Sequence, residues 1–118
     1  MTDHMPYPVK VFFTATNNSD PETYIRAFHK DAILLDAGHE WKGIDAIKVW
    51  SDKDVFAANV RYEIVNTVRS GDKIMVTAQV DGDYDKTNLP DPLLLDHHFT
   101  VRDDKISELV IELHSGVK

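Results

Sequence analysis

Hydrophobic side chains in the first half of the chain recur at the spacing of amphipathic helices. The first such segment places four positions on one helical face: Val9, Phe12, Phe13 and Thr16. Asp20 and Pro21 mark the start of a second helix, because a capping carboxylate and a proline both favour the first helical turn. Ile47 and Trp50, about one turn apart after Gly43, predict a third helix.

Alternation with a period of two takes over in the rest of the chain and predicts β-strands. The apolar run DAILLD (31–36) and the short return HEWK (39–42) form the first pair. Four longer strands follow, separated mostly by short polar turns that favour antiparallel pairing: 60–68, 73–80, 92–101 and 105–113. The exception is the twelve-residue segment 81–92, which holds two of the five prolines. A loop of that length is usually functional or mobile.

The order of these elements indicates the fold class. Helices followed by a run of strands predict an α+β arrangement, in which three helices pack on one side of a curved sheet that is mixed but mostly antiparallel. The 118 residues are 42% hydrophobic, which is enough for one core. We therefore expect a single domain that spans residues 1–118.

Charge and composition narrow the range of partners. The chain has 20 acidic and 13 basic residues, a net charge of −7, and no local cluster of lysine or arginine. We therefore expect neither nucleic acid nor membrane as a partner. The absence of cysteine excludes disulfides and thiolate metal sites. The N-terminal residues do not have the pattern of a leader and no apolar run is long enough for a membrane span, so we expect a soluble cytoplasmic protein.

One carboxyl group stands out on the predicted strand 31–36. Strand alternation puts Asp36 on the same face as Ala32 and Leu34, so it points where apolar side chains point. An unpaired carboxylate on such a face costs several kcal/mol, and burial raises its pKa. Two interpretations stay open: an acid–base group that faces a cavity, or a polar residue that ends the strand and caps the following turn.

The two adjacent histidines of strand 92–101 point to opposite faces and cannot share one ligand. His97 lies on the face of Leu95 and Phe99, and His98 lies on the other. If the Phe99 face is concave, His97 can meet Asp36 and exchange a proton with it. The alternative is a buried histidine that is hydrogen-bonded within the structure.

Several aromatic side chains are candidates for ligand contact, because small-molecule pockets are mostly apolar with a few polar groups. They are Phe12, Phe28, Trp50, Phe99 and, as a lid in the long loop, Tyr84. For those outside the loop, packing in the core is the alternative. Trp50 stands out because its indole N–H can point into a pocket while its ring packs.

The long loop also invites a calcium interpretation. Asp81, Asp83 and Asp85 stand at alternate positions, as acidic ligands do in calcium loops. An EF-hand needs glycine at the sixth position and glutamate at the twelfth, which are Lys86 and Pro92 here. We therefore expect a solvated acidic loop, no metal site and no cofactor.

Three pieces of the sequence occur in a familiar order. They are the D-A-x-x-x-D strand, the G-x-x-A-I-x-x-W helix start, and the P-x-x-L-x-H-x-F-x-V strand with its K-I-x-x-L-x-I partner. From about residue 8 to residue 113 the chain resembles the SnoaL-like branch of the nuclear transport factor 2-like superfamily, which also holds ketosteroid isomerases and limonene epoxide hydrolases. The resemblance implies a cone-shaped, cystatin-like α+β roll around a central cavity, commonly dimeric through the outer face of its sheet. It does not imply one reaction.

The resemblance also assigns a role to Asp36. In ketosteroid isomerases an aspartate near the end of the first strand is the base, while a tyrosine and a protonated aspartate hold the enolate oxygen. The tyrosine position matches Phe12 and the second aspartate position matches His97 or a neighbour, so half of the oxygen-binding site is missing. This departure argues against steroid isomerase activity and leaves a general-base role for Asp36, as in SnoaL-like cyclases.

Three functions follow from this interpretation, in descending order of preference. The first is an enzyme of isomerase, cyclase or hydrolase type that acts on a small hydrophobic carbonyl compound, with Asp36 as base and His97 as its partner. The second is a module that binds an apolar ligand without turnover, and the third is an interaction domain. We also expect a homodimer, because the outer face of the sheet carries more apolar and β-branched side chains than a solvated face needs: Val65, Thr67, Met75, Thr77, Leu94 and Val110.

Overall fold

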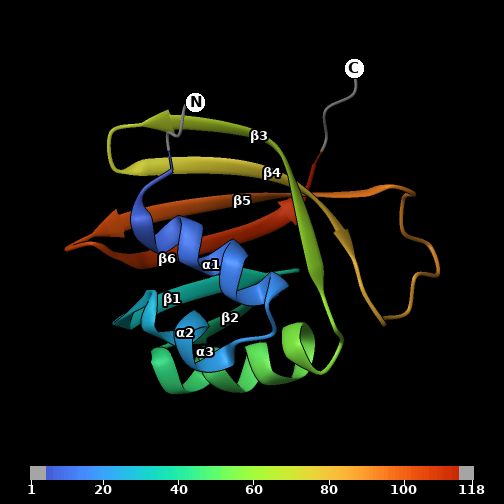
Figure 1. Cartoon of the computed structure of the whole chain (residues 1–118), viewed down its shortest axis with the longest axis horizontal. Coiled ribbons are helices and arrows are strands. Elements are labelled where there is room, and N and C mark those ends of the chain that lie inside the picture. The colour runs from blue at the N-terminus through green and yellow to red at the C-terminus, as the bar shows by residue number, and fades with distance from the viewer. Residues whose placement is uncertain (1–4, 115–118) are drawn as a thin grey trace.

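Helices cover one face of a six-stranded sheet in a computed structural model that describes residues 5–114 (Figure 1). The first four residues, which belong to the segment inspected for a leader, lie outside the described residues. The helical elements are α1 (Tyr7–Asn17), α2 (Pro21–Arg26), α3 (Ile44–Ser51) and the π-helical turn η1 (Asp52–Phe56). The strands are β1 (Phe28–Asp36), β2 (His39–Lys42), β3 (Arg61–Ser70), β4 (Lys73–Asp81), β5 (Leu93–Arg102) and β6 (Lys105–Leu113).

The local signals in the sequence act as predicted at the starts of α2 and α3. The Asp20 side chain accepts a hydrogen bond from the backbone N–H of Thr23 at 3.3 Å, and Pro21 occupies the first helical position. Gly43 precedes α3 with a φ of 88°, a conformation that glycine adopts without strain. Its N–H donates to the carbonyl of Ala32 at 2.8 Å, which anchors the start of α3 beside β1.

The sheet has the order β2-β1-β6-β5-β4-β3. Its strands pair antiparallel except for β1 and β6, so the sheet is mixed, as predicted. Strand β1 begins at Phe28, three residues before the predicted start, because Phe28 already pairs with Ile106 of β6. The pairing with β6 is then interrupted and resumes at Ile33. A second irregularity, between Ile64 and Asn66, interrupts β3 where this strand bends across the front of the molecule in Figure 1.

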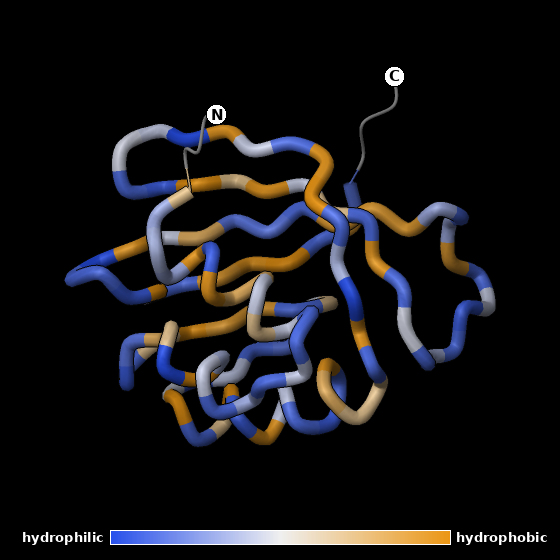
Figure 2. Tube along the Cα trace, viewed as in Figure 1, coloured by the Kyte–Doolittle hydropathy of each residue, from blue (hydrophilic) through white to orange (hydrophobic). Residues whose placement is uncertain are grey.

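The core lies between the helices and the inner face of the sheet. Hydropathy alternates along several strands (Figure 2), which turns their apolar side chains toward α1 and α2. Phe12 is fully buried at the centre of this layer. Six rings have centroids within 6.1 Å of its own: Phe13, Tyr24, Phe28, Tyr62, His97 and Phe99. Burying one such aromatic side chain stabilises a fold by about 1.5–3 kcal/mol.

The outer face of the sheet carries most of the side chains predicted there, with one correction. One row across it runs through Val68, Met75, His98, Val110 and Leu35. Thr77 and Leu94 lie on the same face, and the Thr77 hydroxyl donates to Asp96 at 2.6 Å. The prediction for Thr67 is wrong: it pairs with Val76, which is fully buried on the inner face. The irregularity beside Val65 shifts the alternation of β3 by one residue.

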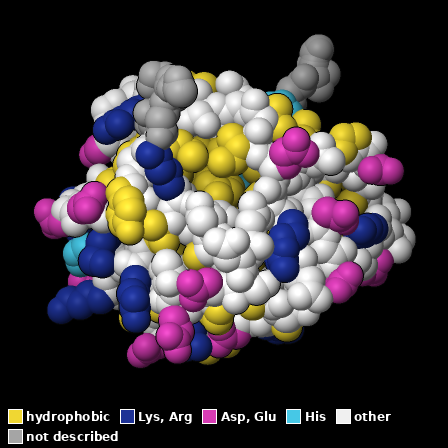
Figure 3. All heavy atoms as spheres, viewed as in Figure 1, with side chains coloured by type: hydrophobic (Ala, Val, Ile, Leu, Met, Phe, Trp, Pro, Cys, Tyr) yellow, Lys and Arg dark blue, Asp and Glu magenta, His cyan; other side chains and the backbone are white. Residues whose placement is uncertain are grey.

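Charges are scattered over the face drawn in Figure 3. Acidic and basic side chains alternate around the rim of that face without a single-sign patch. Within residues 5–114 no helix combines the length and the apolar content that a bilayer crossing requires.

Candidate functional site

Asp36 ends β1 on the inner face of the sheet. It lies opposite Ile111 of β6, and Ile111 lies opposite His97 of β5. Because directly paired residues on neighbouring strands point to the same side, all three face the helices. Strand β6, which carries Ile111, therefore lies between the strands that carry the two titratable groups, Asp36 and His97.

The Asp36 side chain lines a small pocket of about 160 Å³ that lies on the inner side of the sheet and opens to solvent, called the inner cavity below. The other lining residues come from α3, η1, the turn before β3, β3, β4, the long loop, β5 and β6: Trp50, Asp54, Val55, Val60, Tyr62, Val80, Tyr84, Leu89, Leu93, Leu95 and Ile111. A second, larger groove of about 630 Å³ shares five of these residues with the inner cavity: Asp36, Leu89, Leu93, Leu95 and Ile111. Asp36 therefore stands where an inner cavity and a mostly apolar groove adjoin.

One hydrogen bond orients the Asp36 carboxyl group. The indole Nε1–H of Trp50 donates to its Oδ2 at 3.3 Å. Burial raises the pKa of Asp36, and the negative charge of Asp54 raises it further. The Trp50 hydrogen bond and nearby His39 oppose that rise, but the net direction is upward. Burial therefore dominates, in the direction expected from the sequence, and the Trp50 indole is the side chain that hydrogen-bonds to the carboxyl group.

Two tyrosine hydroxyl groups accompany the carboxyl group. Tyr62 lines the same cavity, and burial together with the charge of Asp36 raises the pKa of its hydroxyl. Tyr24 is fully buried on α2, and burial, Tyr62 and Asp36 raise the pKa of its hydroxyl well above the usual value. Both hydroxyls therefore keep their protons at neutral pH and can act as hydrogen-bond donors.

His97 lies in the aromatic core and does not contact Asp36. Its ring is fully buried, with the rings of Tyr62 and Phe13 at centroid distances of 5.0 and 5.2 Å. Nδ1 lies 3.3 Å from the carbonyl oxygen of Val76, which places the ring proton on that nitrogen. Burial lowers the pKa of His97 to about 4, so the ring is neutral at physiological pH. The predicted His97–Asp36 contact is not made, because Ile111 occupies the strand between them.

The predicted ligand-contacting aromatics separate into two groups. Trp50 and Tyr84 line the cavity. Phe12, Phe28 and Phe99 do not line it, because they pack into the fully buried ring cluster of the core. Alternation along a strand or helix shows which side a ring faces, but it does not show how deep that ring lies.

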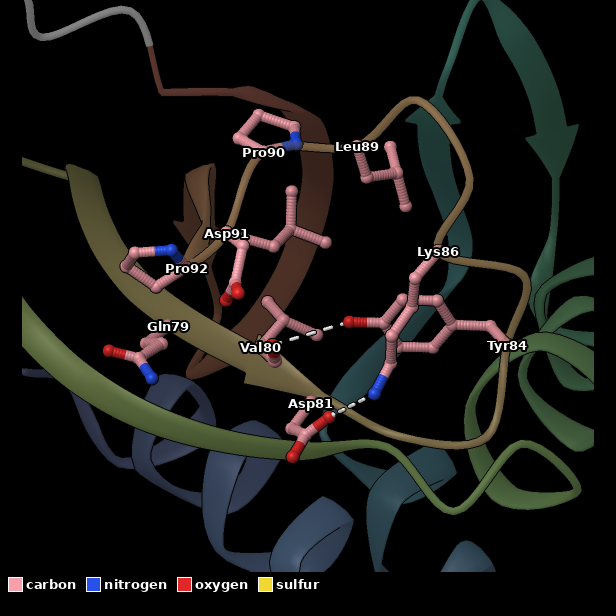
Figure 4. A pocket seen from close by; sticks show the side chains of 10 residues that line it. Gln79, Val80, Asp81, Tyr84, Lys86, Leu89, Pro90, Asp91 and Pro92 are labelled. Atoms are coloured by element: carbon pink, nitrogen blue, oxygen red, sulfur yellow. Dashed lines mark hydrogen bonds and ion pairs between the residues drawn. The ribbon is translucent and has the colours of Figure 1, made fainter.

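The long loop folds over one end of the sheet (Figure 4). The Tyr84 hydroxyl donates to the carbonyl of Val80 at 3.2 Å, and Lys86 lies 5.5 Å from the centre of the Tyr84 ring. Lys86 also pairs with Asp81 at 2.7 Å. Leu89, near the far end of the loop, borders both the inner cavity and the groove. The loop therefore forms one wall of the site.

The three alternating aspartates of the loop have separate partners. Asp81 binds Lys86, Asp83 accepts from the Asn59 amide at 2.8 Å, and Asp85 accepts from the backbone N–H of Thr87. Across the part of the chain that the structure describes, no three histidine, aspartate or glutamate side chains are arranged to hold a metal ion.

Sequence reasoning did not identify Tyr62 or the leucines of the groove. Tyr62 lies on the inner face of β3, four strands from β1 in the sheet order. The alternation of this strand could have shown that the Tyr62 ring faces inward. No sequence pattern near Tyr62, however, indicated that its strand lies close to Asp36. Together these side chains make an apolar compartment with one carboxyl group and hydroxyl donors, an arrangement suited to moving a proton next to an oxygen atom.

Comparisons with known proteins agree with this architecture. The family model described as SnoaL-like domain matches residues 9–109. No curated protein matches the sequence significantly. The crystal structure of a candidate polyketide cyclase from Sinorhizobium meliloti is 30% identical, with a TM-score of 0.82 over 92% of this chain and 95% of that one.

Two more distant structures share the fold. A protein with a ketosteroid isomerase-like fold from Catenulispora acidiphila, solved with trimethylamine, is 20% identical, with a TM-score of 0.77 over 92% of this chain and 85% of that one. A cystatin-fold protein from Novosphingobium aromaticivorans is 18% identical, with a TM-score of 0.71 over 89% and 94% of the two chains.

Proposed function

The chain belongs to the SnoaL-like domain family, and from this membership and the site geometry we propose that it binds a small hydrophobic carbonyl compound and moves one of its protons. The proton acceptor is the carboxylate of Asp36. The product is an isomer or a cyclised form of the same compound.

The observation that carries this proposal is the placement of Asp36. The carboxyl group is half-buried between an inner cavity and a groove whose lining is largely apolar, and burial raises its pKa. A base whose pKa is closer to the working pH is a better proton shuttle, because it both accepts and returns the proton. The Trp50 indole holds the carboxyl group in one orientation during this exchange.

The proposed step balances without a cofactor. The Asp36 carboxylate takes a proton from a carbon next to the carbonyl, and the electron pair of that C–H bond becomes an enolate. Where the enolate is conjugated with a C=C bond, return of the proton to the γ-carbon instead of the α-carbon shifts that double bond and gives an isomer. Attack of the enolate carbon on a second carbonyl of the same molecule, followed by protonation of the new alkoxide, gives a ring. Either route leaves Asp36 ionised again.

The similar protein from Sinorhizobium meliloti, described as a candidate polyketide cyclase, supports a substrate with enolisable carbonyl groups. The size of the site supports a compact substrate. An apolar cavity of about 150 Å³ accommodates a benzene-sized ring, so the inner cavity of about 160 Å³ suits one ring or its equivalent. The inner side of the adjoining groove, along Leu93, Leu95 and Ile111, receives the rest of an apolar body.

Solvent exchange tests the proposal directly. Ketones of one or two rings, such as acetophenone and 1-tetralone, are incubated with the protein in deuterium oxide, and loss of the α-proton signal is followed by NMR. The expected result is α-proton exchange that is faster than in buffer alone and whose rate saturates as the ketone concentration rises. Saturable binding without exchange for the whole panel would contradict the catalytic proposal and favour a module that only binds its ligand.

We also propose that two copies associate through the outer face of the sheet. The row Val68, Met75, Val110 and Leu35 crosses that face, and Val68 is 51% exposed in the single chain. Sedimentation at tens of micromolar is expected to give a dimer, because covering such a row removes apolar surface from water. Val110→Lys is expected to give a monomer, whereas Val49→Lys on exposed α3 leaves the dimer intact. A monomeric unmodified protein at that concentration would refute the association.

A further inference from the structure

The long loop, residues 81–92, borders a pocket that the proposed reaction does not use. This loop pocket has a volume of about 390 Å³ and lies beside the Tyr84 ring (Figure 4). Its lining includes an amide, two carboxylates and an ammonium group: Gln79, Asp81, Asp91 and Lys86. The loop pocket can therefore satisfy the hydrogen bonds of a polar group, for which the largely apolar groove offers few partners.

The loop pocket and the inner cavity share one wall. Four residues line both: Val80, Tyr84, Leu89 and Leu93. Two of them, Leu89 and Leu93, also line the groove. Leu93 belongs to β5 and pairs with Val80 of β4, so the sheet fixes its position. Among the described residues, Leu89 is therefore the one that the loop supplies to the junction of all three hollows.

Local structure holds Leu89 in this position. Its backbone N–H donates to the carbonyl of Lys86 at 3.2 Å, and the Lys86 ammonium pairs with Asp81 at 2.7 Å. Asn88 has a φ of 65°, in the left-handed region that asparagine tolerates, and Pro90 disfavours helical backbone at Leu89. Figure 4 shows the Leu89 side chain pointing inward from the loop. It is still 37% exposed, so shortening it removes little core packing.

We propose that Leu89 determines which ligands the site accepts, because its side chain closes the inner cavity off from the polar loop pocket. This inference rests on the proposed function and adds a specificity rule to it. A ketone in the inner cavity extends along the apolar inner side of the groove. A polar extension is left without hydrogen-bond partners there, which costs free energy. The site therefore selects ketones with an apolar body, and Leu89 sets that selectivity.

Two ketones of equal length test this rule: 4-butylacetophenone and 4-(3-hydroxypropyl)acetophenone, in which a hydroxyl group replaces the terminal methyl group. Isothermal titration calorimetry gives the Kd of each, and the ratio of the two is the preference for the apolar chain. The unmodified protein should prefer the butyl compound about tenfold or more. Leu89→Ala joins the loop pocket to the inner cavity, so the hydroxyl group reaches Lys86 or Asp91. The hydroxypropyl compound should then bind about tenfold more tightly, and the preference should fall by the same factor.

Leu113→Ala is the matched control. Leu113 is 52% exposed and lines the groove but neither the inner cavity nor the loop pocket, so the same truncation there should keep the preference. Two further variants at position 89 act in opposite directions. Leu89→Val thins the wall and should lower the preference by a smaller factor than alanine does, whereas Leu89→Phe thickens the wall and should not lower it.

Three results overturn the inference. These are a preference in Leu89→Ala that stays within about threefold of the unmodified value, an equal change in Leu113→Ala, or a fall that comes only from weaker binding of the butyl compound. Neither Kd depends on turnover. A Leu89-dependent preference in a protein that catalyses no exchange would therefore refute the proposed reaction and keep the specificity rule, whereas exchange with an unchanged preference would do the reverse.

Discussion

Replacing Asp36 by asparagine is expected to slow proton exchange of a substrate ketone by about 100- to 10,000-fold while leaving the fold intact, a loss typical for a general base. Asparagine has nearly the same shape, and its amide oxygen still accepts the hydrogen bond of the Trp50 indole. It cannot take a proton from carbon. The rate constant for α-proton exchange in deuterium oxide, followed by NMR at saturating ketone, measures this effect.

The pH profile of exchange gives an independent check. The base must be ionised, so the rate should rise with pH and level off above the pKa of Asp36, which burial shifts upward. The same shift means that the folded protein binds this proton more tightly than the unfolded chain does. The ionised carboxyl group therefore reduces stability as pH rises through that pKa, and Asp36→Asn should not lower the Tm at neutral pH.

The matched control is Asp45→Asn in the first turn of α3, which removes a carboxylate away from the cavity lining and should keep the full rate. If Asp36→Asn retains exchange within a factor of three of the unmodified protein, Asp36 is not the base. Affinity for ethylbenzene should be nearly unchanged in the variant, because the apolar walls of the site remain.

Acidification from pH 7 to pH 4 is expected to remove about 3 kcal/mol of stability through His97 alone. Its pKa is lowered from 6.5 to about 4 in the folded protein, and each pKa unit corresponds to about 1.4 kcal/mol. Between pH 6.5 and pH 4 the His97 side chain takes up a proton in the unfolded chain but not in the folded protein. The contribution is therefore fully present above pH 6.5 and is lost as pH falls through 6.5 toward 4.

Urea unfolding at several pH values measures this dependence. His97→Gln removes the titrating group and keeps an amide that can donate to the Val76 carbonyl. The free energy of unfolding of the variant should therefore change less between pH 6.5 and 4 than that of the unmodified protein. Equal slopes for the His97 variant and the unmodified protein would show that His97 is protonated in the folded state.

The sequence by itself determined the elements and the faces of most of them. Helix caps at Asp20 and Gly43 act within a few residues of chain, so they could be recognised without knowing the rest of the fold. Strand alternation is equally local, and it placed Asp36 and His97 on inner faces correctly. The order of the three sequence motifs pointed to the SnoaL-like family, and the family model matches residues 9–109.

Only the tertiary structure decided which inward-facing groups meet. Alternation gives the side of a strand but neither its neighbours nor the depth of each residue, so Ile111 between Asp36 and His97 could not be foreseen. An irregularity in one strand also reverses the faces beyond it, as at Thr67. Trp50 and Tyr62 reach the Asp36 cavity from α3 and β3, and this convergence depends on sheet order, curvature and helix packing across the whole chain.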